Sequence, residues 1–174
     1  MKRILLVLAV VSLVFTGVVS ASVQQGETEL DLAGSFQSQN LSDEAGGGTD
    51  NFFTVMTRLG YFITDNIRVG GTASGTWTEG PDTYSLGAFA AYNFMPSNQL
   101  VPYVGGQIGY TWLTGDDEDS NGFMYGPLVG VRYELNPTND LFVEYQFQLF
   151  SGDLGDNLDN VHAVFFGIQH IFKK

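Results

Sequence analysis

The chain has 174 residues, no cysteine, and 19 acidic residues against 7 basic ones. This acidic balance argues against binding to nucleic acid, because such binding requires a basic surface. Disulfides are excluded, so the fold must be held together by backbone hydrogen bonds and by burial.

Residues 1–21 predict a secretory signal peptide. Lys2 and Arg3 form a charged start, residues 4–15 are an apolar core, and Val19 and Ala21 fit a small-residue cleavage site. The apolar core is shorter than the roughly 20 residues that a membrane-spanning helix needs. We therefore expect cleavage after Ala21 and a single domain over residues 22–174. Without Lys2 and Arg3, that domain has 5 basic residues against 19 acidic ones.

Eight segments of the domain alternate apolar and polar residues with period two, as β-strands do, and none shows a helical period. Each is about ten residues long, which is the length a tilted strand needs to cross a bilayer. In chain order the predicted strands are residues 28–37, 53–61, 67–77, 84–94, 103–112, 123–134, 141–149 and 161–172. Short polar turns alternate with longer acidic or glycine-rich loops between them. The pattern predicts an all-β fold, an eight-stranded antiparallel up-and-down transmembrane β-barrel.

Periodicity alone does not say which face of the sheet points inward, since a soluble lipocalin-like barrel also alternates. The apolar face of the predicted strands carries no charged residue. A water-facing exterior would carry many, so we expect this face to meet lipid. Tyrosines and tryptophans near the strand ends fit the aromatic girdles at the two interfaces. Pro127 lies in the middle of a strand, where we expect a bulge or a local break.

Three stretches carry a family resemblance: LGYFITDN at residues 59–66, PYVGGQIGY at 102–110 and GIQHIF at 167–172. The chain resembles the eight-stranded outer-membrane β-barrel family, and is similar to outer membrane protein X and to the barrel domain of outer membrane protein A. The resemblance implies residence in the bacterial outer membrane. It also implies that Phe172, the final aromatic of the last strand, is the signal read by the outer-membrane assembly machinery. Lys173 and Lys174 follow it, and His170 replaces the usual aromatic two places earlier.

The polar face carries a few isolated charges, which we expect in the periplasmic half of the lumen: Arg58, Arg68, Arg132, Glu134 and Glu144, with Glu29 and Asp31 of the first strand. Unpaired charges in a narrow lumen are costly, so these side chains should form a salt-bridge and hydrogen-bond network. The network is predicted to plug the barrel. The alternative is a gate that opens a narrow pore.

The predicted outer loops contain acidic residues and no lysine or arginine: Asp43, Glu44, Asp50, Glu79, Asp82, Asp116, Asp117, Glu118, Asp119, Asp153, Asp156 and Asp159. Asp117, Asp119 and Asn121 match the start of a calcium-binding loop. Leu128, however, occupies the position where a bidentate glutamate belongs. A solvated acidic surface is therefore favoured over a cation-binding loop.

His162 and His170 lie on the lipid-facing side of the last strand. Ser151 and Asp159 lie near His162 in the sequence, but no spacing motif supports a catalytic triad, and no metal-ligand cluster or cofactor motif is present. We predict a non-enzymatic protein with a structural or surface-interaction role. The alternatives are a narrow porin-like channel and, less favoured, a lipid-modifying enzyme. The expected partners are outer-membrane lipid, lipopolysaccharide and the assembly machinery; no nucleic acid, metal or cofactor is expected, and the protein should be a monomer.

Overall fold

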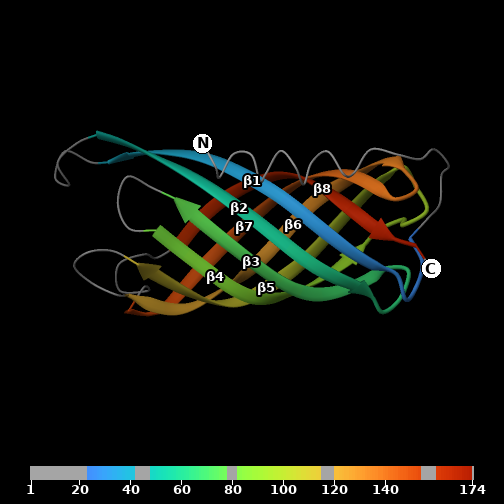
Figure 1. Cartoon of the computed structure of the whole chain (residues 1–174), viewed down its shortest axis with the longest axis horizontal. Coiled ribbons are helices and arrows are strands. Elements are labelled where there is room, and N and C mark those ends of the chain that lie inside the picture. The colour runs from blue at the N-terminus through green and yellow to red at the C-terminus, as the bar shows by residue number, and fades with distance from the viewer. Residues whose placement is uncertain (1–22, 42–47, 78–81, 115–119, 154–159, 174) are drawn as a thin grey trace.

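The computed structural model describes residues 23–41, 48–77, 82–114, 120–153 and 160–173. Eight antiparallel strands follow one another around a closed barrel (Figure 1). They are β1 Thr28–Leu41, β2 Gly48–Phe62, β3 Ile67–Trp77, β4 Asp82–Asn93, β5 Leu100–Thr114, β6 Asn121–Asn136, β7 Asn139–Gly152 and β8 Asn160–Phe172. Within the described ranges, no helix has the length and hydropathy of a membrane span. The predicted eight-stranded barrel is confirmed.

The short connections and the end of the chain lie at one end of the barrel (Figure 1). Polar side chains fix these turns: the Thr64 hydroxyl accepts from the backbone N–H of Ile67 at 2.9 Å, and Asn136 Oδ1 accepts from that of Thr138 at 3.1 Å. In outer-membrane barrels the short turns face the periplasm. The opposite end of the barrel is therefore the outer one.

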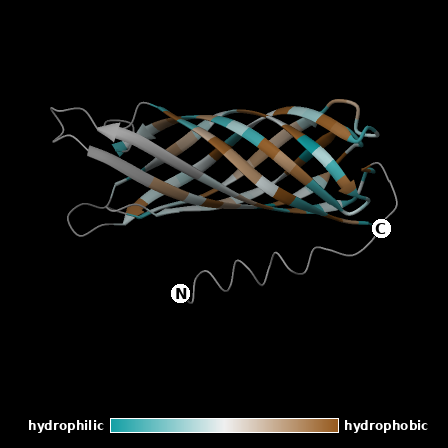
Figure 2. Cartoon of the chain, turned by 90° about the horizontal axis from the view of Figure 1, so that it is seen from above, coloured by the Kyte–Doolittle hydropathy of each residue, from teal (hydrophilic) through white to brown (hydrophobic). Residues whose placement is uncertain are grey.

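Side chains alternate between a hydrophobic exterior and a polar interior. On β7, Leu141, Val143 and Tyr145 are 38–43% exposed, whereas Glu144 and Gln146, which have the opposite parity, are at most 1% exposed. The same alternation appears as bands of brown and teal along the strands (Figure 2). Polar groups are buried and apolar groups are exposed, which is the reverse of a soluble barrel, so the predicted lipid-facing orientation holds.

Aromatic side chains gather near the outer ends of β2 to β6. Trp77 stacks on Phe53, and Trp112 stacks on Tyr84, each with ring centroids 6.4 Å apart. Tyr110 adds to the cluster, with its ring tilted against that of Trp112. Such rings are stable at the level of lipid headgroups because one edge is polar and the rest apolar.

Of the two outcomes expected at Pro127, the structure shows the local break and no bulge. The register between β6 and β7 is the same on both sides of it, with Tyr125 opposite Leu149 and Leu128 opposite Gln146. Only the pairing of Gly126 and Pro127 with β7 is interrupted, because proline has no N–H to donate to the ladder. The register shift lies instead between Glu134 and Asn136, next to the β6–β7 turn.

Gly130 provides a test of how tightly the interior is filled. A methyl group on Gly130 would lie 2.4 Å from the Tyr103 hydroxyl oxygen, whereas one on the lipid-facing Gly71 would lie 3.8 Å from its nearest neighbour. We expect Gly130→Ala to lower the free energy of unfolding by about 1–3 kcal/mol, as overpacking does. Gly71→Ala should change it little. Urea unfolding in lipid vesicles, followed by tryptophan fluorescence, measures both; equal midpoints would contradict the packing described.

Candidate functional site

The barrel interior holds a cluster of charged side chains that are fully buried. Arg58 on β2, Arg68 on β3 and Arg132 on β6 are each at most 1% exposed. Their strand positions follow from inward parity, because every second residue of a strand points into the lumen. The interior of an eight-stranded barrel is only wide enough for side chains to fill it. These long arginine side chains therefore contact residues on other strands inside the lumen.

Glu144 is the centre of the first group. Arg58 binds its carboxylate through both terminal guanidinium nitrogens, Nη1 and Nη2, with Nη1 2.7 Å from Oε2. The Tyr103 hydroxyl donates to the same oxygen at 2.9 Å, and Gln146 donates to the other at 2.7 Å. β2 and β7 are not neighbours in the sheet, so the Arg58–Glu144 pair crosses the lumen. Bidentate arginine–carboxylate pairs of this kind are among the strongest hydrogen-bonded contacts in proteins.

Glu29 is the centre of the second group. Arg68 Nη1 donates to Glu29 Oε1 at 2.8 Å, and Gln169 donates to the second oxygen of the same carboxylate. Arg68 also lies 3.6 Å from Asp31 Oδ2, within ion-pair range. Neither oxygen of Asp31 has a hydrogen-bond partner among the described residues. One arginine therefore joins β3 to two carboxylates of β1.

Aromatic rings lie against the positive charges. The Phe89 ring lies beneath both Arg58 and Arg68, at 4.9 and 5.6 Å from its centroid, and Arg68 also stacks over Tyr103 at 4.6 Å. Cation–π contacts are strongest where the cation is desolvated, as here. The rings thus allow two guanidinium groups to be buried close together.

Arg132 forms a third, looser group near the periplasmic end. Its Nη1 lies 3.3 Å from Asp140 Oδ2, and its guanidinium lies over the Phe62 ring at 5.9 Å. Arg132 Nε and Nη2 have no hydrogen-bond partner among the described residues. Glu134, predicted to join the network, is half-buried at the end of β6, opposite Asp140 in the register.

Neutral amides continue the network toward the outer end. Gln146 Oε1 accepts from Gln107 at 2.8 Å and from Gln148 at 2.7 Å, while its nitrogen donates to Glu144. Gln107 lies on β5 and Gln146 on β7, so this link passes over β6 inside the barrel. Farther out, hydroxyl pairs replace charges: Ser85 contacts Thr111 at 2.8 Å, and Thr54 contacts Thr76 at 2.9 Å.

Several members of the network were missed in the sequence: Asp140, Tyr103, Phe89, Gln146, Gln107 and Gln169. Five of them have inward parity on the predicted strands, so alternation already placed them in the lumen, whereas Asp140 lies just before the predicted strand 141–149. Alternation does not say which inward residues meet, because that depends on the register and the closure of the whole barrel.

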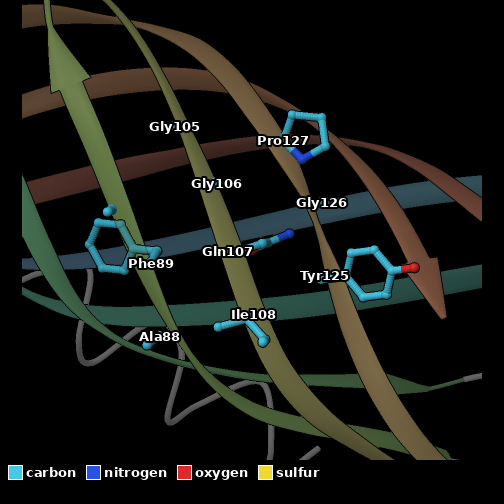
Figure 3. A pocket seen from close by; sticks show the side chains of 10 residues that line it. Ala88, Phe89, Gly105, Gly106, Gln107, Ile108, Tyr125, Gly126 and Pro127 are labelled. Atoms are coloured by element: carbon cyan, nitrogen blue, oxygen red, sulfur yellow. The ribbon is translucent and has the colours of Figure 1, made fainter. Parts of the chain in front are cut away.

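An open hollow of about 690 Å³ lies on the barrel wall over β4, β5 and β6 (Figure 3). Its lining combines small residues such as Ala88, Gly106 and Pro127 with the larger Ile108 and Tyr125. No acidic, basic or histidine side chain lines it. It therefore offers no carboxylate, amine or imidazole for acid–base chemistry.

Both histidines point away from the lumen, as their parity predicts. His162 is exposed, lies 5.0 Å from the Phe147 ring, and shares a hydrogen bond with the Tyr145 hydroxyl through Nδ1. His170 Nδ1 lies 2.8 Å from Asn139 Oδ1. Asp159 lies outside the described residues. Among the residues that are described, no group of three or more His, Cys, Asp or Glu side chains could hold a metal ion.

The candidate calcium loop is described only at its end. Asp117 and Asp119 lie outside the described residues, while Asn121 begins β6 and accepts a hydrogen bond from the Tyr110 hydroxyl at 2.6 Å. Leu128, at the position a bidentate glutamate would take, is buried in the lumen against Ala91 and Tyr103. Cation binding by this loop stays a prediction. Residues 1–21, the predicted signal peptide, also lie outside the described residues, so the signal peptide stays a prediction.

Phe172 ends β8 and is 47% exposed on the lipid-facing side, with its ring edge-on to His170 at 4.7 Å. Its position at the end of the last strand fits an exposed C-terminal aromatic. Recognition by the assembly machinery stays a prediction.

Comparison with known proteins identifies the family. The family described as "Outer membrane protein beta-barrel domain" matches residues 8–172. The chain belongs to this outer-membrane β-barrel family. Its location is therefore the bacterial outer membrane, as the sequence predicted. No curated protein matches the chain.

Solved structures share the fold at low sequence identity. Neisserial surface protein A is 22% identical with a TM-score of 0.65, covering 85% of this chain and 98% of its own. The N-terminal barrel of Pseudomonas aeruginosa OprF is 15% identical with a TM-score of 0.56, covering 85% and 98%. OprG from the same organism is 14% identical with a TM-score of 0.52, covering 88% and 99%. At these identities the likeness concerns the fold alone.

The Arg58–Glu144 pair can be tested by removing one partner or both. We expect Arg58→Met alone to lower the free energy of unfolding by about 3–5 kcal/mol, because it leaves a buried carboxylate unpaired. Arg58→Met combined with Glu144→Leu should cost less than the two single changes added together. Urea unfolding in vesicles measures the coupling, and strictly additive losses would show that the two side chains do not interact in the lumen.

Proposed function

We propose that this protein is a non-enzymatic outer-membrane barrel with a structural or surface-interaction role and a lumen that does not conduct. The observation that carries the proposal is the bidentate Arg58–Glu144 pair, which crosses the lumen with both side chains fully buried. The Arg68–Glu29 pair and the Gln107–Gln146 link add further connections between strands. An ion path would have to displace all of them.

The free-energy cost of breaking the buried ion pairs favours a plugged lumen over a gate. Breaking a buried ion pair without replacing its partner costs about 3–5 kcal/mol. Glu144 accepts hydrogen bonds from three different residues, so moving Arg58 alone would not free a passage. Phe89 lies beneath both Arg58 and Arg68, and this further limits their movement.

The charge of the loops supports a role at the cell surface. The predicted outer loops carry twelve acidic residues and no lysine or arginine. Loops of this kind repel anions, so contact with anionic lipopolysaccharide would require bridging divalent cations. We propose outer-membrane lipid and lipopolysaccharide as the protein's immediate partners and a monomer as its working state.

Planar-bilayer recording separates the proposed role from a channel. We expect the refolded wild-type protein to give no discrete conductance steps at any salt concentration, because the network fills the lumen. The variants Glu144→Gln and Arg132→Gln should behave in the same way, with Gly71→Ala as a control for insertion. Steps in the wild-type protein would contradict the proposal; steps confined to the two lumen variants would support the gate instead.

Lipid analysis tests the absence of enzymatic activity. The outward His162 shares a hydrogen bond with the Tyr145 hydroxyl on the lipid-facing side of the barrel. We expect lipid A from cells with and without the gene to have the same mass spectrum. A mass difference that is lost on His162→Ala would overturn the non-enzymatic assignment.

A further inference from the structure

The barrel is closed by the pairing of β1 with β8, and this is the shortest stretch of paired strands in the described sheet. β1 and β8 pair only over Thr28–Gly34 and Phe166–Phe172, which is seven residues of each strand. Within the described residues, the other neighbouring strands pair over longer stretches, such as Leu41 to Thr28 of β1 with β2. Each lost ladder position leaves backbone groups without a partner in the sheet, and this is costly in a membrane. The β1–β8 seam is thus the place where the closed barrel has the least backbone support.

A tight turn precedes β1 at the periplasmic end of this seam. Gly26 has a φ of 88° and donates its N–H to the Phe62 carbonyl at 2.8 Å, while Phe62 donates back to the Glu27 carbonyl at 3.0 Å. The turn directs Val23 into the mouth of the barrel, where it is 6% exposed and packs with Phe62 and Ile171. Val23 thus joins residues of β2 and β8 beneath the charged network.

An ion pair extends the seam beyond its last ladder pair. Thr28 is opposite Phe172, so Glu27 and Lys173 occupy the next position of the same register. Lys173 Nζ lies 3.1 Å from Glu27 Oε2, and the backbone N–H of Gln24 donates to the same oxygen at 2.9 Å. The Glu27 side chain is 5% exposed and that of Lys173 23%, so water screens this pair less than a surface pair.

We propose that Val23, Glu27 and Lys173 form a latch that holds the β1–β8 seam closed at the periplasmic end of the barrel. The ion pair joins the residue before the first strand to the residue after the last one. Val23 holds the same turn in place by packing against Phe62 and Ile171 inside the barrel. This gives Lys173, which follows the final aromatic residue, a role in the folded protein that is separate from assembly. The latch acts where the backbone ladder is shortest.

Hydrogen exchange of backbone amides tests the latch in the full mature protein, refolded in lipid vesicles. Glu27→Gln keeps an oxygen for the Gln24 N–H but removes the charge; Lys173→Gln removes the partner charge. Each should speed exchange of the seam amides in Leu30–Ala33 and Gly167–His170 by about two- to fivefold. The β4–β5 amides should be unchanged. Lys174→Gln, which removes the same charge one residue later, is the matched control.

The double variant Glu27→Gln with Lys173→Gln should exchange no faster than the faster single variant, because the two residues form one contact. Val23→Ala should speed seam exchange roughly tenfold through lost burial. Additive effects of the two charge changes would overturn the ion-pair part of the latch. Unchanged seam exchange in all variants, or equal acceleration of the seam and of the β4–β5 ladder, would overturn the latch itself.

Discussion

Backbone hydrogen bonding in a medium without water is the constraint on which this structure depends. In hydrocarbon every N–H and C=O must find a partner within the protein, and a β-sheet meets that demand only when it has no free edge. β1 therefore pairs with β8 as well as with β2. Closure then determines the direction of every side chain, because alternate residues of each strand must point to lipid or to the lumen.

Closure with only eight strands also makes the lumen a filled interior. The polar side chains that alternation sends inward lose water there, so they must satisfy one another. Glu144 and Glu29 meet this demand by accepting hydrogen bonds from several donors each. Phe89 and Tyr103 provide the aromatic surfaces on which the guanidinium groups rest. The same contacts that satisfy the buried charges also obstruct the lumen, so stability and the proposed lack of conduction have one physical cause.

The seam shows how side chains supplement the ladder where it is short. Gln169 of β8 donates to Glu29 of β1 inside the barrel, and Lys173 contacts Glu27 at its mouth. Both contacts join the start of the first strand to the end of the last strand, and these two segments are far apart in sequence. The periplasmic half of the interior therefore combines the charged network with the fastening of the first strand to the last, while the outer half is lined by neutral hydroxyl and amide groups.

The sequence by itself determined the strand number, the lipid-facing side and the inward position of most lumen charges, though not of Asp140, because a period of two and a charge-free face are local properties of the chain. Alternation also placed His162 and His170 outside the lumen. Only the tertiary structure decided which charges meet: Arg58 pairs with Glu144 across the barrel, and Arg132 with Asp140. Those partners depend on register and on the diameter of the closed sheet, which no single strand encodes. The effect of Pro127 was also decided by the tertiary structure. Gly106 of β5 pairs with Pro127 and keeps β6 in register, although β7 does not pair with it.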